Sequence, residues 1–415
     1  MWQKFLDRFL NRFVKTGTLE ASFPDGTRGR YGDGSAPAVE VRLTDPSLLR
    51  RMVLDPDLAL GEGYMEGGLT IAGDDLRGLM TLALRNLQQQ NAGGRFAALT
   101  QAPGQVLRWL DQMNPAGRSR RNVVHHYDLS GRLYELFLDE DRQYSCAYFR
   151  SPNDTLEQAQ RAKKAHIAAK LLLRPGMRVL DIGCGWGGMA LTLARDHGAH
   201  VLGVTLSEEQ HRVANQRVRA AGLEDRVEIR LADYRSVTGR FDRIVSVGMF
   251  EHVGLPHYGT YFAKVHDLLA EDGIALIHTI GRSAPPSRTS SFIRKYIFPG
   301  GYVPSMSEAS RAIERQDLWT ADVEVLRLHY AETLRHWEQR VSAHAAEIVA
   351  LYDERFLRMW RYYLIASEMS FREGRQCVFQ FQLSRKVDAV PVTRDYLYRS
   401  PATLRVVADE QLAAE

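Results

Sequence analysis

The feature that most constrains the fold is a regular alternation of short apolar runs and amphipathic stretches that begins after residue 175. Helical patterns separate most of the runs typical of buried strands, which cover 177–183, 199–207, 225–234, 241–250 and 273–280. This alternation predicts a mostly parallel, doubly wound sheet. Ligands of such sheets bind at the carboxyl ends of the strands. The residues at those ends are Asp181–Gly187, Thr205–Ser207, Asp233, Glu251 and His278.

The loop after the first strand, VLDIGCGWGG at 179–188, fits two cofactor-binding patterns. Its glycines spell both the GxGxxG of dinucleotide-binding proteins and the GxGxG of S-adenosylmethionine-dependent methyltransferases. Asp181 favours the second, because a carboxylate is unwelcome beside a pyrophosphate but is well placed to hold the ammonium of a methionine moiety. The second strand ends in GVTLSEEQ, without the acid that both kinds of protein usually carry there. Thr205, Ser207 and Gln210 therefore depart from both patterns.

Six motifs occur in the order and spacing of one enzyme family: YSCAYF, VLDIGCGWGG, VTLSEEQ, SVGMFEHVG, LIHTIG and HYAETLRHW. On these residues the sequence resembles the cyclopropane-fatty-acid synthases over essentially its whole length. The resemblance implies an α/β fold with a Rossmann-like class I methyltransferase sheet, preceded by a small α+β N-terminal domain. That domain is similar to the one in the longer, phospholipid-modifying bacterial members, which the mycolic-acid cyclopropane synthases lack.

The resemblance also implies a reaction, in which a methylene group passes from S-adenosylmethionine to the cis double bond of unsaturated acyl chains in membrane phospholipids. The double bond is a weak nucleophile that becomes a carbocation, so ring closure needs one base in an otherwise apolar site. In the family this base is a bound bicarbonate. Its ligands fall on Cys146, Glu251, His278, Ile280 and Tyr330. Cys146 is thus expected to contact the anion and not to act as a nucleophile.

Cofactor contacts follow from the same resemblance and, for Asp181, from the loop chemistry. They are expected at Tyr144, Ser145, Asp181, Gly183, Cys184, Gly185, Thr205, Leu206, Ser207, Gln210, Asp233 and Tyr234. One departure is visible, because some members carry a cysteine where the helix YYLIASEMSFR has Ser367. A nucleophilic cysteine at that position is therefore excluded for this chain.

The chain is expected to divide into four segments. They are a small N-terminal α+β domain at 1–115, a linker and helical lid carrying YSCAYF at 116–175, the methyltransferase domain at 176–390 with a lipid-binding insertion at about 282–322, and a tail at 391–415. Within the first segment, 16–60 is patterned like short strands and 75–112 like helices. The stretch 1–17 predicts an amphipathic helix, flanked by Lys4, Arg8, Arg12 and Lys15, that docks on its own domain or touches a membrane surface.

The cysteine spacing, the apolar runs and the net charge of the chain limit the metals, membrane spans and partners that it is expected to have. The three cysteines lack the spacing of a disulfide framework or a zinc site, so no metal is expected. No apolar run reaches the length of about 18 residues that a membrane span requires, and a net charge of +4 makes no case for nucleic acid. We expect a cytoplasmic enzyme that associates peripherally with the inner membrane and, by resemblance, forms a homodimer.

Other functions stay open at this point. Relatives that share the chemistry up to the carbocation lose a different proton and yield methylene- or methyl-branched chains. A small-molecule N-methyltransferase could use the same sheet, with a polar acceptor pocket and no need for bicarbonate or lipid. A non-catalytic lipid-binding protein would require a broken cofactor loop, which this chain does not have.

Overall fold

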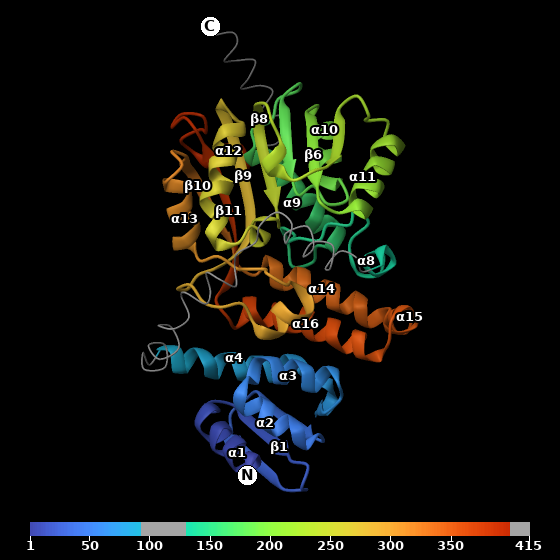
Figure 1. Cartoon of the computed structure of the whole chain (residues 1–415), viewed down its shortest axis with the longest axis vertical. Helices are drawn as coiled ribbons and strands as arrows, with labels where there is room; N and C mark the ends of the chain where they lie inside the picture. Colours follow the sequence, from blue (N-terminus) through green and yellow to red (C-terminus); the bar gives the residue numbers. More distant parts are fainter. Residues whose placement is uncertain (93–129, 399–415) are drawn as a thin grey trace.

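The computed structural model describes residues 1–92 and 130–398. A small N-terminal domain, a helical layer and a large sheet flanked by helices follow one another along the long axis of the molecule (Figure 1). The basic stretch 114–122, the second half of the helical pattern at 75–112 and most of the expected tail lie outside the described residues. None of the described helices is both long and apolar enough to cross a membrane.

The large sheet has the strand order β10-β11-β9-β8-β5-β6-β7. Its strands are β5 (Arg178–Ile182), β6 (His200–Thr205), β7 (Val227–Leu231), β8 (Phe241–Val247), β9 (Leu269–Arg282), β10 (Trp319–Leu326) and β11 (Gln376–Ser384). The strands from β7 to β9 pair in parallel, whereas β11 runs antiparallel to both β9 and β10. The predicted doubly wound, mostly parallel sheet is therefore confirmed. The strand order reverses at β5, the strand that leads into the glycine loop.

Both faces of this sheet are buried, which is why its strands read as nearly continuous apolar runs. Leu180 and Ile182 belong to one apolar cluster and Val179 to another, as the period of two in a strand requires. The first cluster includes residues of α12 (Tyr258–Leu268) and α13 (Met306–Glu314). The second includes residues of α9 (Leu156–Lys170), α10 (Gly188–His197) and α11 (Glu208–Ala220).

The edge strand β10 begins inside the stretch that the sequence assigned to a lipid-binding insertion. It is exposed at many positions, Trp319 among them, and it lacks the continuous apolar run of the inner strands. Elsewhere in the insertion, a π-helical turn at Ile293–Ile297 packs on the N-terminal domain, whereas α13 packs beside α12 on the large sheet. Lys295 and Tyr296 of that turn both donate to Glu62 of the N-terminal domain.

The N-terminal domain contains a four-stranded sheet of order β2-β1-β3-β4 and several helices. Its elements are α1 (Trp2–Phe13), β1 (Thr18–Ser22), β2 (Arg28–Gly32), β3 (Ala38–Leu43), α2 (Pro46–Leu54), α3 (Pro56–Met65), β4 (Leu69–Ile71) and α4 (Leu76–Ala92). The expectation of strands throughout 16–60 is wrong, because 46–60 is helical. Asp45 and Asp55 cap α2 and α3, and each is followed by a proline at the first helical position.

A helical layer joins this domain to the sheet (Figure 1). It is built from α8 (Gly131–Phe137), α14 (His329–Ala343), α15 (Ala345–Leu351) and α16 (Glu354–Arg372). One buried apolar cluster runs from Leu6 in α1 through Trp360 in α16 to Trp186 in the glycine loop. The N-terminal domain therefore shares a core with the helices that cover the site.

Candidate active site

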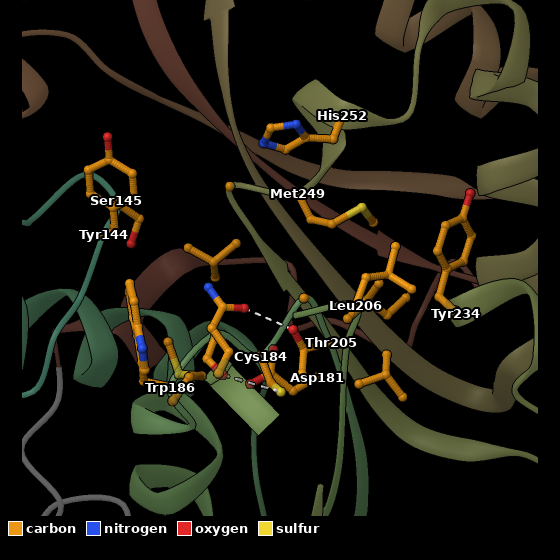
Figure 2. A pocket seen from close by; sticks show the side chains of 18 of the residues that line it. Tyr144, Ser145, Asp181, Cys184, Trp186, Thr205, Leu206, Tyr234, Met249 and His252 are labelled. Atoms are coloured by element: carbon orange, nitrogen blue, oxygen red, sulfur yellow. Dashed lines mark hydrogen bonds between the residues drawn. The ribbon is translucent and has the colours of Figure 1, made fainter. Parts of the chain in front are cut away.

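A pocket opens at the carboxyl ends of β5, β6 and β8, where the doubly wound topology places ligands. All the expected cofactor residues line it except Ser207. In Figure 2, Tyr144 and Ser145 lie on one side of the pocket and Tyr234 on the other, with Asp181 and Thr205 between them. The sequence motifs that are spread over 90 positions thus converge on one cavity.

The glycine loop shapes the floor of the pocket. Gly183 has a φ of +80° and Gly185 a φ of +54°, values in the left-handed region that side chains other than glycine rarely adopt. A Cβ at Gly183 would lie 3.0 Å from the side chain of Met249, whereas one at Gly185 would meet nothing within 4 Å. The loop therefore turns tightly and leaves open space at Gly185 for close approach of a ligand.

Asp181 supplies a buried carboxylate whose chemistry suits a cationic ligand. Its side chain lies at the end of β5 and is 1% exposed. Its Oδ2 has no hydrogen-bond partner among the described residues. Burial raises the pKa of Asp181 to about 7, partly offset by the charge of Lys163. An ammonium group at Oδ2 would satisfy both the orphaned atom and the charge, so these residues fit the methionine end of S-adenosylmethionine.

The end of β6 offers a neutral polar group where related folds carry an acid. Thr205 Oγ1 donates to Gln210 Oε1 at 2.8 Å, and this leaves the amide NH₂ of Gln210 as a donor. Both side chains line the pocket. Ser207 lies outside it and caps α11, where its Oγ accepts from the Gln210 backbone N–H. Its contribution is therefore the orientation of Gln210.

The segment 139–146, which carries the start of YSCAYF, forms one wall and is anchored from α9 and α11. Asp141 forms ion pairs with Lys164 and with Arg217. Burial alone would raise the pKa of Asp141, but these two cations hold it below its usual value. A Cβ at Gly188 would lie 2.3 Å from Gln143, so the segment passes directly over the start of α10.

The residues expected to hold bicarbonate do not line the pocket itself. The backbone N–H of Ile280 donates to Glu251 Oε1 at 2.6 Å, while Glu251 Oε2 has no partner within the described ranges. Burial raises the pKa of Glu251 to about 7. His278 is neutral because burial lowers its pKa well below the usual value. Its Nδ1 accepts from Gln380 Nε2 at 3.1 Å, which puts the ring proton on Nε2.

The other two expected ligands, Cys146 and Tyr330, lie on the YSCAYF segment and on α14. Cys146 is 1% exposed, and burial raises the pKa of its thiol, so the thiolate that a nucleophile needs is disfavoured. The next residue, Ala147, donates its N–H to Thr333 Oγ1 at 3.0 Å, one turn along α14 from Tyr330. These contacts tie the Cys146 segment to α14.

Aromatic rings fill the space around this segment. The ring of Tyr144 lies 5.1 Å from that of Trp337 and 6.0 Å from that of Phe137, and its hydroxyl is 3.0 Å from that of Tyr363 in α16. Tyr330 packs edge-on against Trp337. The surroundings of Tyr144 are therefore mostly apolar and aromatic.

Several pocket residues were not among the individual cofactor contacts expected from the resemblance. They are Arg142, Gln143, Ile182, Trp186, Met189, Val204, Ala232, Arg235, Val247, Gly248, Met249, His252 and Val253. Burial lowers the pKa of His252 to about 4, so it is a neutral wall residue at pH 7. Most of these adjoin predicted residues in the chain, and a window of three residues around each motif would have included them.

Comparisons with known proteins identify the family of this chain. The sequence profile described as mycolic acid cyclopropane synthetase matches residues 115–381, and a profile described as a domain of unknown function matches residues 5–91. The cyclopropane-fatty-acyl-phospholipid synthase of Escherichia coli strain K12 is 40% identical over 358 residues, which cover 86% of this chain and 90% of that protein. The tuberculostearic acid methyltransferase UfaA1 of Mycobacterium tuberculosis is 37% identical over 407 residues, with 92% and 91% covered.

Solved structures also match the fold of this chain. The cyclopropane synthase MmaA2 from Mycobacterium tuberculosis superposes with a TM-score of 0.62 at 33% identity, covering 65% of this chain and 99% of that one. The fold, the glycine loop and the buried Asp181 define an S-adenosylmethionine-dependent methyltransferase of class I. Within that class, the chain belongs to the mycolic acid cyclopropane synthetase family.

Proposed function

We propose that this enzyme transfers a methylene group from S-adenosylmethionine to the cis double bond of unsaturated acyl chains in membrane phospholipids and so forms a cyclopropane ring. The observation that carries the proposal is the burial of Cys146, Glu251 and His278, with a neutral His278 and a raised Glu251 pKa, together with the aromatic rings packed around Tyr144, which lines the cofactor pocket. A polar acceptor, as an N-methyltransferase needs, would find few charged partners there. The name of the Escherichia coli relative supports the phospholipid substrate.

The residues of the pocket hold the reactants in place. S-adenosylmethionine, when bound, supplies an electrophilic methyl group. Asp181 Oδ2 holds the ammonium end, and the amide of Gln210 offers a donor to the sugar. The faces of Tyr144 and Trp337 stabilise the positive charge that develops on the acyl chain, since aromatic rings attract cations without attacking them. Burial of these groups keeps water away from the charge.

Removal of the last proton requires a base, and we assign this task to a bicarbonate held by Cys146, Glu251, His278, Ile280 and Tyr330. Glu251 Oε2 and the Nε2–H of His278 are suited to bind one oxyanion, provided that Glu251 is protonated. Its raised pKa of about 7 favours that form. The backbone N–H of Ile280 already donates to Glu251, so an anion bound at Ile280 has to share this donor with the Glu251 carboxyl group.

Access to phospholipids implies contact with a membrane surface, and α1 has a suitable face. Leu6 anchors the helix to its own domain, while Trp2, Phe5 and Phe9 are exposed to at least 36%. Basic residues at Lys4 and Arg8 flank these aromatic rings. Aromatic and basic side chains on one helix suit the interface of an anionic bilayer. Peripheral association with the inner membrane and a homodimeric state remain part of this proposal.

The test is incubation of the protein with unsaturated phospholipid vesicles, S-adenosylmethionine and bicarbonate, followed by mass spectrometry and proton NMR of the released fatty acids. We expect a gain of one methylene group and the upfield ring-proton signal. Saturated phospholipid vesicles are the matched control and should yield nothing. Loss of less than half the turnover in the Glu251→Gln enzyme would contradict the assigned role of Glu251.

A second product is favoured by one comparison, since the chain is 37% identical to a protein named a tuberculostearic acid methyltransferase. After a hydride shift, the same carbocation loses a proton from the added methyl to give a methylene branch, or from a neighbouring chain carbon to give a methyl-branched alkene; a saturated methyl branch would in addition require a hydride-donating reductant. Vinylidene protons or a branch methyl signal in the same NMR spectrum would identify this outcome. The absence of any lipid product from a protein that binds cofactor would overturn both.

A further inference from the structure

The last four residues of the motif YSCAYF, segment 146–149, form neither helix nor strand, so their backbone N–H groups need partners outside the segment. The N–H of Ala147 donates to Thr333 Oγ1 at 3.0 Å. The N–H of Phe149 donates to His329 Nδ1 at 3.1 Å. Both acceptors belong to α14 and are four residues apart, so they lie one above the other on one face of the helix. Two side chains of one helix thus hold the segment by its backbone.

The two acceptors are themselves fixed in place. The buried Thr333 hydroxyl donates its proton to the backbone carbonyl of His329 at 2.7 Å, so its oxygen is left to accept from Ala147. The ring of His329 stacks on that of Tyr148, with 4.8 Å between the centroids and 15° between the planes. The N–H of Tyr148 donates to the carbonyl of Ala159 in α9 at 3.1 Å. The segment is therefore held between α14 and α9.

These hydrogen bonds join the two elements that carry Cys146 and Tyr330, two of the residues assigned above to the base. Cys146 immediately precedes Ala147, and Tyr330 stands in α14 between His329 and Thr333. Cys146 and Tyr330 are 1% and 8% exposed, so neither side chain can move far unless its own element moves. A misplacement of about 1 Å between reacting groups can lower a rate about 100-fold. The register of the segment against α14 therefore matters for turnover.

We propose that His329 and Thr333 are positioning residues, which hold the segment 146–149 in register with α14 and so set Cys146 against Tyr330 during the reaction. This inference rests on the proposed function, because it concerns residues assigned there to the base. Neither His329 nor Thr333 touches a reactant. Each acts by offering a neutral acceptor to a backbone N–H of the segment that would otherwise lose its partner.

The cofactor wall at the start of the same motif has other anchors. Ser145 Oγ accepts from Lys163 Nζ at 2.9 Å, and the Tyr144 hydroxyl lies 3.0 Å from that of Tyr363 in α16. Neither of these hydrogen bonds involves α14. Loss of either α14 acceptor should therefore lower kcat and leave the affinity for S-adenosylhomocysteine nearly unchanged.

The His329 acceptor exists only in the neutral imidazole, whose proton is then on Nε2. Burial lowers the pKa of His329 below its usual 6.5, although the charge of Glu324 opposes this shift. The ring is therefore neutral at pH 7, and its protonation at lower pH would set two N–H donors against each other at Phe149. Charged and titratable groups act on this ring or on the stacked ring of Tyr148 from α9, from β10 and from the flanking loops. They are His166, Glu324, Arg327, Arg150 and Tyr398.

The experiment compares His329→Leu with His329→Asn, and Thr333→Val with Thr333→Ser. In each pair the first variant removes the acceptor, and the second keeps an oxygen acceptor at nearly the same place. Turnover is measured on vesicles of unsaturated phospholipid at saturating bicarbonate, and S-adenosylhomocysteine binding is measured by calorimetry. At pH 8 we expect kcat to fall about tenfold in His329→Leu and in Thr333→Val, and to stay within about threefold of the parent in the other two. The affinity for S-adenosylhomocysteine should stay within about twofold in all four.

The pH dependence separates this role from simple packing. As the pH falls from 8 to about 5.5, the parent loses its imidazole acceptor, whereas the amide oxygen in His329→Asn does not titrate. The ratio of kcat in His329→Asn to kcat in the parent should therefore rise as the pH falls below 6.5. Because both enzymes are measured at equal bicarbonate concentration, this ratio cancels the titration of bicarbonate itself.

Contrary outcomes fall on different claims. A parent that binds S-adenosylhomocysteine but yields no lipid product overturns the proposed function, and this inference with it. A parent that forms product, with an unchanged kcat in Thr333→Val, overturns the inference alone. Equal losses in both members of a pair, or a kcat ratio that does not change with pH, also overturn it, because packing alone would then explain the losses. If His329→Leu does not fold, the nearly isosteric pair at Thr333 decides the question.

Discussion

Burial of the Asp181 carboxylate lowers the free energy of unfolding of the protein without cofactor at neutral pH. Its pKa is raised from 3.8 to about 7 by burial. Between these values the folded protein holds a proton that the unfolded chain has released, so the free energy of unfolding falls as the pH rises through this window. At 1.36 kcal/mol per pKa unit the loss approaches about 4 kcal/mol above pH 7. Binding of a cationic ligand at Oδ2 offsets this loss.

Asp181→Asn should therefore separate stability from binding. Without cofactor, the variant should unfold at pH 8 with a free energy about 2–4 kcal/mol higher than that of the parent, while the two should converge near pH 4. Its affinity for S-adenosylhomocysteine should fall about 100-fold, because an amide cannot neutralise an ammonium. Urea unfolding at both pH values and calorimetry provide the measurements. A variant that binds as tightly as the parent would contradict the role given to Asp181.

Asp181 and its glycine loop were predictable because an apolar strand, a glycine-rich loop and a helical pattern follow one another directly in the sequence. Lys163 was not. It stands in the polar helix sequence QRAKKAHIAAK, where two adjacent lysines look equally exposed. Both turn inward, Lys163 to 0% and Lys164 to 7% exposure, because α9 packs against the segment 139–146, and that contact joins parts of the chain 18 residues apart.

Among the elements, those with both faces or one whole face buried were the predictable ones. The strands β5, β6, β8 and β9 were recognised because each contains a run of apolar residues, and β7 was recognised although it lies at an edge of the sheet. The strand β10 was missed because exposed positions, Trp319 among them, interrupt its apolar pattern. The helices α2 and α3 were missed although Asp45 and Asp55, each followed by proline, carry the signal of a capped helix start.

The contact between α3 and the insertion predicts how a substitution at Gly61 changes the stability of the protein. Gly61 lies in the middle of α3, where glycine costs helix stability, yet a Cβ at this position would lie 2.3 Å from the ring of Phe292. Gly61→Ala should therefore lower the free energy of unfolding by about 1–3 kcal/mol despite the better helix propensity of alanine. Thermal unfolding measures the change. In the Phe292→Leu background the same substitution should cost nothing, and an equal cost in both backgrounds would contradict the packing argument.

The two domains that the sequence analysis separates share one buried apolar core. The apolar cluster that begins at Leu6 reaches Trp186 in the cofactor loop. Arg77 of α4 crosses the same boundary and donates to Glu338 of α14 at 2.8 Å and to Glu368 of α16 at 2.9 Å. These helices carry or flank the residues expected around the anion. The sequence showed a boundary in composition, but it could not show which charges would meet across it.

Arg77→Met tests this coupling. The carboxylates of Glu338 and Glu368 are 5% and 2% exposed and keep Arg361 and Arg372 as second partners, so loss of Arg77 should cost about 2 kcal/mol at pH 7. Burial would raise the pKa of Glu338, but Arg77 and its other partners hold it below the usual value. Its contribution is therefore present above pH 4.5 and is lost as the pH falls through the folded pKa. Calorimetric scans should show a large difference from the parent at pH 7 and a small one at pH 4.

Arg85→Met is the matched control, because Arg85 lies on the same helix and pairs across the same boundary with Glu373. Its side chain is 50% exposed, and exposed pairs are worth about 0–1 kcal/mol. We expect this variant to unfold within about 1 kcal/mol of the parent and to keep one transition. The Arg77→Met protein should show a second, earlier transition as the N-terminal domain separates. Equal effects of the two substitutions would mean that the shared apolar core alone joins the domains.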